Sequence, residues 1–162
     1  MADLQGAVAL VTGGWRGIGR SVVDSLRGAG AQVCFTYLDG IEPLDQISAL
    51  CAADPMLSAL PLDLRDKTSI RACLDQVVQR FGGIDILVNN AAVGSATVAG
   101  FADDPSDQDD LMLQINAGGT LAMCRGFLAR PATGTARKII NLSSVGGGVA
   151  VFPGFSLSDG MS

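Results

Sequence analysis

Residues 12–19, with the sequence TGGWRGIG, could bind the phosphate groups of a nucleotide. They follow a short apolar run and precede a helical pattern, and the first N–H groups of a helix are unpaired and carry partial positive charge. Glycines let the backbone turn tightly and approach a phosphate with no Cβ atom in the way. A tight turn without any ligand is the alternative, but the position after the first strand of a βαβ unit favours the binding interpretation.

Groups that could transfer a proton at neutral pH are few. Histidine is absent, the only tyrosine is Tyr37, and the only lysines are Lys67 and Lys138. Reduction of a carbonyl needs a positioned acid that titrates near the working pH. Tyr37 ends a predicted strand, and the two lysines begin a predicted helix and a predicted strand. The sequence therefore places no tyrosine beside a lysine.

Hydrophobic periodicity predicts alternating strands and helices that would position these residues. The predicted strands are 7–12, 32–37, 57–62, 84–89 and 138–143, and the predicted helices are 17–28, 41–53, 66–81 and 107–129. Asp66 is expected to cap the third helix and Gly82 to end it. Pro61 inside a strand predicts a sheet edge. Apolar strands that alternate with helices indicate an α/β fold with a doubly wound parallel sheet.

Length and composition narrow the class of protein. The 162 residues are expected to form one domain, and the net charge of −5 without a basic stripe argues against nucleic acid or anionic lipid as a partner. No apolar run is long enough to span a bilayer, and the start lacks the basic region of a secretory signal, so a cytoplasmic location is expected. Four dispersed cysteines and no histidine predict buried, reduced thiols and no metal site.

Several motifs, in order along the chain, resemble those of the short-chain dehydrogenase/reductase family. Residues 12–19 resemble the family's TGxxxGIG turn, and NNAA at 89–92 resembles its NNAG, with Ala92 in place of glycine. Asp63 in LPLDLRD, Asn116 in LQINAGGT and Ser144 in IINLSSVGG fall at matching positions. The resemblance implies a Rossmann-like sheet of about five strands in the order 3-2-1-4-5, without the last strands of the family.

The same resemblance assigns roles to individual residues. Asp63 would contact the adenine ring, and Ser144 and Asn116 would belong to the catalytic tetrad. The residues implied to bind the cofactor are Gly13, Arg16, Gly17, Ile18, Gly19, Tyr37, Asp63, Leu64, Asn90 and Ala91. Structural alternatives remain: Asp63 could cap a helix, Asn116 could satisfy backbone carbonyls and Ser144 could be a turn serine. For Asn89 we favour a purely structural role at a strand end.

Residues near the end of the second strand bear on the choice of cofactor. An NAD-preferring site has a carboxylate there, but Tyr37 takes that position and the nearest acid, Asp39, is two residues further on. Arg16 lies in the glycine turn, and in this it resembles the basic residue that NADP-preferring members of the family carry in the same turn. A guanidinium can bind a 2′-phosphate through two hydrogen bonds, so NADP(H) is expected to be preferred over NAD(H).

The family's YxxxK pair is missing from the sequence. Aligned on GMS, Asp159 takes the place of the tyrosine, and an aspartate is mostly ionised at neutral pH unless it is buried. We therefore expect an oxidoreductase by family, truncated relative to its relatives, with weak or absent turnover as written. A catalytically silent dinucleotide-binding module and non-redox chemistry on the same scaffold are the alternatives.

The family resemblance and the exposed edge of the sheet also predict the partners of the protein. An active protein would take a small-molecule carbonyl or alcohol as substrate. The strand 138–143, left at an edge, would promote self-association, so we expect a homo-oligomer or pairing with a sibling chain.

Overall fold

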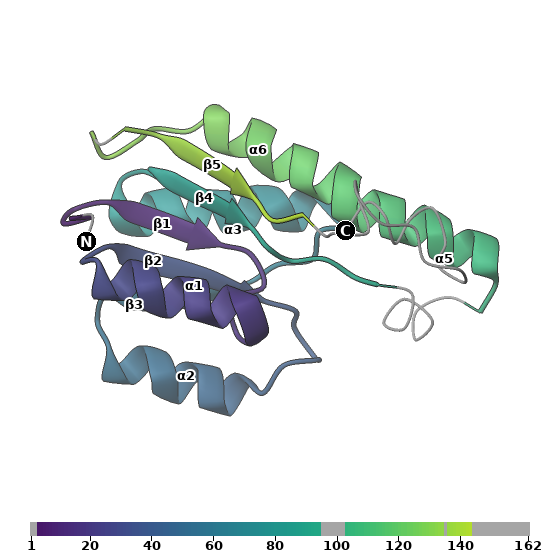
Figure 1. The fold of residues 1–162 in the computed structure, drawn as a ribbon, viewed down its shortest axis with the longest axis horizontal. Helices are drawn as coiled ribbons and strands as arrows, with labels where there is room; N and C mark the ends of the chain where they lie inside the picture. Colours follow the sequence, from purple (N-terminus) through teal and green to yellow (C-terminus); the bar gives the residue numbers. More distant parts are fainter. Residues whose placement is uncertain (1–2, 95–102, 135, 144–162) are drawn as a thin grey trace.

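The computed structural model describes residues 3–94, 103–134 and 136–143. Within them, five strands alternate with helices, as the periodicity predicts (Figure 1). The strands are β1 (Val8–Val11), β2 (Gln32–Tyr37), β3 (Leu57–Pro61), β4 (Ile86–Asn89) and β5 (Lys138–Asn141). The helices are α1 (Gly17–Gly28), α2 (Leu44–Ala53), α3 (Lys67–Phe81), α5 (Pro105–Met112), the π-helix η1 (Leu113–Gly119) and α6 (Thr120–Leu128).

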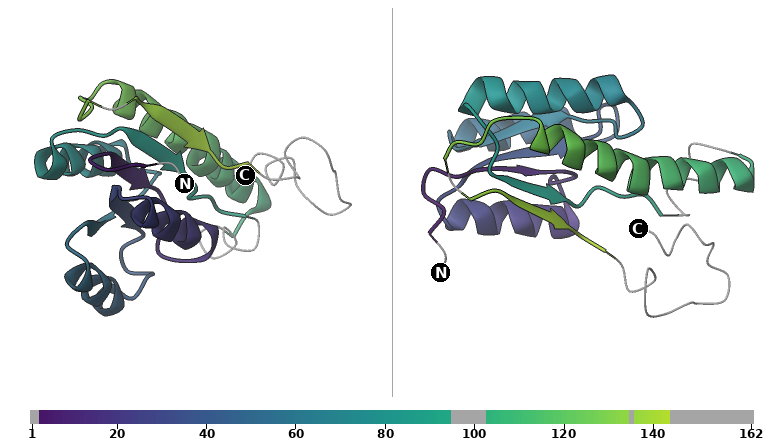
Figure 2. Two further views of the ribbon diagram at one scale, coloured as in Figure 1. Left: turned by 60° about the vertical axis from the view of Figure 1, so that its left-hand side comes forward. Right: turned by 90° about the horizontal axis from the view of Figure 1, so that it is seen from above.

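The five strands form one parallel sheet in the order β3-β2-β1-β4-β5. Leu10 in β1 is in register with Cys34 on one side and with Leu87 on the other. Figure 2 shows α1 on one side of the sheet and α3 and α6 on the other. The expected doubly wound sheet and its strand order are confirmed, and all described strands end at the same edge.

Two apolar cores, one on each face, hold the sheet between its helices. Side chains alternate between the faces of a strand, so Val8 and Leu10 of β1 join the core under α3 and α6, while Ala9 and Val11 join the core under α1 and α2. All four are essentially inaccessible to solvent. This double burial explains why β1 is apolar without a polar alternate position.

Boundary residues explain most of the differences from the predicted elements. The predicted helix 41–53 begins only at Leu44, because Pro43 has an extended backbone (ψ 96°) and ends the preceding loop. The predicted helix 107–129 begins at Pro105, because the side chain of Asp104 accepts a hydrogen bond from the backbone N–H of Ser106. The predicted strands 7–12, 57–62, 84–89 and 138–143 are each one or two residues too long. Backbone pairing, not hydrophobicity, determines where a strand ends.

The region predicted as one helix from 107 to 129 contains a π-helical segment. Figure 1 shows a continuous rod from α5 to α6 whose α5 end projects beyond the ends of the strands. The middle of this rod, η1, buries Ile115, Asn116 and Gly119. A Cβ atom at Gly119 would lie only 2.7 Å from the Cβ of Leu64, so the rod packs closely on the chain that follows β3.

The signals at the ends of α3 and at the sheet edge are confirmed. The side chain of Asp66 accepts a hydrogen bond from Thr68 N at 2.7 Å, and Gly82 ends the helix with a left-handed backbone (φ 85°). β3 pairs only with β2 in the described sheet, which leaves Pro61 at an edge. β5 is the other outer strand there, with Ile140 46% exposed.

The cysteines are all free, but only two of them are buried as predicted. Cys34 and Cys73 lie in the core under α3, and this burial raises the pKa of each thiol to about 12. Cys51 and Cys124 are partly exposed. Their helices, α2 and α6, are outer layers with one face in solvent, so the prediction was wrong for these two.

Candidate functional site

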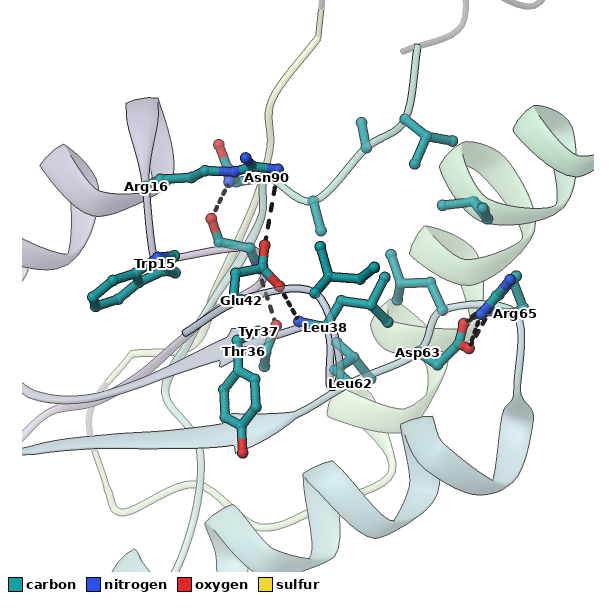
Figure 3. Close-up of a pocket in the computed structure, with 17 residues that line it drawn as sticks. Trp15, Arg16, Thr36, Tyr37, Leu38, Glu42, Leu62, Asp63, Arg65 and Asn90 are labelled. Carbon is teal, nitrogen blue, oxygen red and sulfur yellow. Dashed lines mark hydrogen bonds and ion pairs between the residues drawn. The ribbon is translucent and has the colours of Figure 1, made fainter. Parts of the chain in front are cut away.

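A cleft of about 290 Å³ opens where the strands end (Figure 3). Clefts at the carboxyl ends of parallel strands are the usual ligand sites of open α/β sheets. Its wall is built from the glycine turn, the loops after β2 and β3, and the segment after β4. The lining residues are Gly13, Trp15, Arg16, Thr36, Tyr37, Leu38, Ile41, Glu42, Leu62, Asp63, Leu64, Arg65, Asn90, Ala91, Ala92, Val93 and Ile115. Seven of the ten predicted cofactor-binding residues are among them, and Gly17, Ile18 and Gly19 begin the adjoining α1.

Two glycines of the turn are required for different physical reasons. Gly17 has φ 57°, which residues with a Cβ rarely adopt, and a Cβ built on it would meet nothing within 4 Å. Gly19 has the opposite surroundings, because a Cβ there would overlap the carbonyl oxygen of Gly13 and the amide nitrogen of Asn90. The turn therefore packs tightly against Gly13 and Asn90 at Gly19, whereas the space beside Gly17 is free.

The first turn of α1 has the features of an anion-binding helix end. None of the described side chains caps it, and it contains no acidic residue. Ile18, in that first turn, is 68% exposed. The free N–H groups and the open space at Gly17 fit a pyrophosphate group, which would lie against backbone with no Cβ in between.

Asn90 and Thr12 connect the end of β1 to the end of β4. The side-chain nitrogen of Asn90 donates to the carbonyl oxygens of Thr12 and Gly13, both at 3.0 Å. The hydroxyl oxygen of Thr12 accepts from the backbone N–H groups of Asn90 and Ala91, both at 3.0 Å. Thr12 is 1% exposed, so these bonds are protected from water. The contacts of Asn90 within the protein position the glycine turn.

Thr36 holds the turn from the other side. Its side-chain oxygen accepts from Gly13 N, and its carbonyl oxygen accepts from Gly14 N, both at 3.1 Å. The sequence motifs include Thr12 as the first residue of the turn without giving its side chain a role, and they do not include Thr36. A signal was present: each is a hydroxyl residue that directly follows a run of buried apolar residues near the carboxyl end of a strand.

Arg16 and Glu42 face each other across the mouth of the cleft (Figure 3). Nη2 of Arg16 lies 3.9 Å from Oε1 of Glu42, and the Arg16 side chain is 75% exposed whereas that of Glu42 is 14% exposed. Oε2 of Glu42 accepts from Leu38 N at 2.8 Å. The sequence reasoning named Asp39 as the nearest acid, but Asp39 is exposed and accepts from Gly40 N. The acid that faces Arg16 in this cleft is Glu42, which no sequence motif indicated.

Asp63 is bound by Arg65 at the opposite end of the cleft. Nε of Arg65 donates to both carboxylate oxygens of Asp63, at 2.9 and 3.0 Å, and Nη2 donates to Oδ2 at 2.6 Å. These side-chain bonds and the one from Arg65 N hold the pKa of Asp63 below its ordinary value. Leu64, between them, is buried and lines the cleft. Asp63 is therefore ionised at neutral pH, and the positive charge of Arg65 compensates its negative charge.

Tyr37 lines the cleft, but its ring points away from Arg16 and Glu42 in Figure 3. Burial, and then the nearby charge of Asp39, raise the pKa of the Tyr37 hydroxyl. The only tyrosine of the sequence is thus a weaker acid than a free tyrosine.

Asn116, predicted as catalytic, lies in η1 and binds the segment after β4. Its Nδ2 donates to Val93 O at 2.8 Å and its Oδ1 accepts from Val93 N at 2.9 Å. The structure thus brings Asn116 to the wall of the cleft that Ala91, Ala92 and Val93 form. Ser144 and Asp159, the other residues of the predicted catalytic region, lie outside the described residues.

The end of β4 also carries Asn89, for which a structural role was favoured. Its Nδ2 donates to Oδ1 of Asn141 at 2.8 Å, and these residues are in register on β4 and β5. The contacts of Asn89 agree with that role.

Membrane-spanning helices and clusters of metal-binding side chains are both absent from the part of the chain that the structure describes. No helix there combines the length and apolar character needed to cross a membrane. Nor do three or more metal-binding side chains gather at one place within those residues.

Comparisons with known proteins agree with the motifs. A family model described as short chain dehydrogenase matches residues 7–157. Fluoren-9-ol dehydrogenase from Terrabacter sp. (strain DBF63) is 35% identical over 150 residues, and sorbitol dehydrogenase from Cereibacter sphaeroides is 36% identical over 146 residues. Each alignment covers 89% of this chain, but only 42% and 55% of the respective relative. The chain thus spans about half the length of these curated relatives.

Solved structures show the same architecture. A short chain dehydrogenase from Burkholderia cenocepacia J2315, in complex with NADP, superposes with a TM-score of 0.79 at 30% identity, over 96% of this chain and 62% of that one. A blue fluorescent protein from a metagenomic library, in complex with NADPH, also gives 0.79 at 26% identity, over 97% of this chain and 63% of that one.

Proposed function

Because the chain belongs to the short-chain dehydrogenase/reductase family, we propose that it binds a nicotinamide dinucleotide, with NADP(H) preferred, and serves an oxidoreductase that acts on a small carbonyl or alcohol. The observation that carries this proposal is the pairing of an uncapped first turn of α1 with a cleft at the ends of the strands. The glycine turn between them is held in place by Thr12, Thr36 and Asn90.

Each described residue of the cleft has a proposed part in holding the dinucleotide. The backbone at Gly17, Ile18 and Gly19 would bind the pyrophosphate, and the Asp63 carboxylate would accept from the adenine amino group while Arg65 keeps it ionised. The bound dinucleotide supplies or accepts a hydride, and the chain orients it by these contacts. Asn116 would shape the wall of the cleft through Val93.

Arg16 supports the preference for NADP(H). Its guanidinium is largely exposed at the mouth of the cleft, and its one ion pair within the described residues is a long one of 3.9 Å with Glu42. Five N–H donors in a planar group suit a phosphate, so the 2′-phosphate of NADP(H) is the proposed ligand of Arg16. Two structural relatives were solved with NADP or NADPH bound, which agrees with this choice.

Turnover by these 162 residues would be limited by the lack of a suitable proton donor. They contain one tyrosine and no histidine, and the ring of Tyr37 points away from Arg16 and Glu42. Ser144 and Asn116 remain the proposed catalytic residues, and Asp159 is a poor donor while ionised. This observation favours a second candidate function, a catalytically silent dinucleotide-binding module that works with another chain.

Calorimetric titration of the 162-residue protein with NADPH and with NADH tests the proposal. We expect heat with both and tighter binding of NADPH. Arg16→Ala should weaken NADPH binding about tenfold, the loss of one charge-assisted contact, and change NADH binding less than about twofold. Arg71→Ala, which removes an exposed charge on α3, is the matched control and should change neither. Absence of heat with both dinucleotides would refute the binding proposal.

Turnover separates the two candidate functions. The silent module predicts NADPH binding without ketone reduction, whereas the enzyme predicts steady-state oxidation of NADPH by a simple ketone.

The proposal also includes a single domain over residues 1–162, a cytoplasmic location, and a homo-oligomer or pairing with a sibling chain. Light scattering of the purified protein, alone and with a longer family member, tests the assembly.

A further inference from the structure

Glu42 places a nearly buried carboxylate at the mouth of the cleft. Its side chain is 14% exposed, although the loop between β2 and α2 that carries it is on the surface. Backbone and side chain are both engaged there: Glu42 N donates to Leu38 O at 3.3 Å, and Oε2 accepts from Leu38 N at 2.8 Å. These two contacts with Leu38 fix the carboxylate in one position.

The second oxygen of the same carboxylate points to Arg16. Oε1 lies 3.9 Å from Nη2 of Arg16, at the limit of an ion pair, whereas the bond of Oε2 to Leu38 N is short. The two groups therefore differ in freedom: Glu42 is fixed, and Arg16, 75% exposed, can turn its remaining donors toward a ligand.

We propose that Glu42 is a specificity-determining residue that weakens binding of a dinucleotide with a 2′-phosphate, because it competes with that phosphate for Arg16. This inference rests on the proposed function. A phosphate monoester carries a charge of about −1.5 to −2 at neutral pH, so a phosphate on Arg16 would lie beside a fixed negative charge. A ribose 2′-hydroxyl in the same place is neutral and can donate a hydrogen bond to Oε1 instead.

The preference between NADP(H) and NAD(H) then depends on the balance between two opposing electrostatic effects on the 2′-phosphate. Arg16 attracts the 2′-phosphate, and Glu42 repels it and partly neutralises Arg16. Because discrimination is a difference of affinities, removal of the repulsive group should increase the preference for NADPH more than it changes the affinity for NADH.

Glu42→Gln isolates the charge from the packing. The glutamine side-chain oxygen can still accept from Leu38 N, so the loop keeps its bond while the negative charge is lost. Asp39→Asn is the matched control, because it removes the same charge from the same loop at an exposed residue that does not line this cleft. Glu42→Ala, which removes both charge and acceptor, provides a second variant if the glutamine variant does not fold.

The measurement is the dissociation constant of NADPH and of NADH for wild type, Glu42→Gln, Glu42→Ala and Asp39→Asn, by calorimetry. We expect the ratio of the NADH to the NADPH constant to rise at least tenfold in both Glu42 variants and to change less than about twofold in Asp39→Asn. A ratio that stays within twofold of wild type in a folded Glu42 variant, with both ligands bound, overturns this inference and leaves the proposed function intact. Binding of neither ligand to the wild type overturns both.

Discussion

Asn116 and Val93 exchange two hydrogen bonds, so that the asparagine amide pairs with the backbone of Val93 as a neighbouring strand would. Nδ2 of Asn116 donates to Val93 O at 2.8 Å, and Oδ1 accepts from Val93 N at 2.9 Å. Asn116 is 8% exposed and lies in the π-helix η1. The pair fixes the segment after β4 to the helix beside it, and with it one wall of the cleft.

Asn116→Ala should lower the free energy of unfolding by about 2 kcal/mol, because two backbone groups of Val93 lose their partner. Asn116→Asp should lower it further at neutral pH, since a carboxylate can accept from Val93 N but repels Val93 O. Urea unfolding followed by circular dichroism gives both values. Gln114→Ala, an exposed residue of the same helix whose bond to Arg65 O is 3.2 Å, should cost about 0.5 kcal/mol or less.

Gly19→Ala should destabilise the protein by about 1–3 kcal/mol and abolish dinucleotide binding. The added methyl group would overlap Gly13 O and Nδ2 of Asn90, and so push the turn out of place. Gly28→Ala is the control within the same helix, because a Cβ there meets nothing within 4 Å. It should leave stability unchanged or raise it by up to about 1 kcal/mol. Thermal unfolding and titration with NADPH measure both effects. Equal stability and equal NADPH affinity of the two variants would contradict the prediction.

Stability should depend on pH through Asp63 and Arg65. The folded-state pKa of Asp63 is below its ordinary value, so its contribution is fully present above that ordinary value, near pH 4, and is lost as the pH falls through the folded-state pKa. Arg65→Gln should therefore lower stability at pH 7 and lose less on acidification than wild type does. Urea unfolding at pH 7, 5, 4 and 3 measures this. An equal loss for wild type and variant, with Arg71→Gln as the charge-matched control, would contradict it.

The four cysteines should fall into two classes of reactivity. The thiols of Cys34 and Cys73, buried and with pKa values raised to about 12, are neither ionised nor accessible at pH 8. Cys51 and Cys124 are partly exposed. Mass spectrometry after brief treatment with iodoacetamide should find label on Cys51 and Cys124 in the folded protein, and on Cys34 and Cys73 only after addition of urea. Label on Cys34 in folded protein would show that its core opens.

The order of elements could be predicted because their signals are local. Apolar runs such as that around Leu10 indicate strands, and Asp66 and Gly82 mark the two ends of α3 through bonds to neighbouring residues. The strand order came from the resemblance to a family and not from periodicity, and the structure confirms it.

The interior of the site could not be predicted because its bonds join residues far apart in sequence. The Asn90 side chain reaches Gly13 across 77 positions, and nothing local marks that contact. The place of Glu42 depends on how the loop folds back on Leu38, and helix periodicity cannot distinguish the π-helical turn around Asn116 from an ordinary one. Arg16 and Asp63 were named from the motifs, but their partners Glu42 and Arg65 were not.

The bonds of Thr12 and Asn90 have a consequence for the way a ligand would be received. Since the floor of the cleft is already fixed to two strands, association would freeze little of the backbone, and the unfavourable entropy that flexible loops impose on binding is small there. At the rim, the Arg16 side chain is 75% exposed and its ion pair with Glu42 is long, at 3.9 Å, so adaptation to different ligands is concentrated in that side chain.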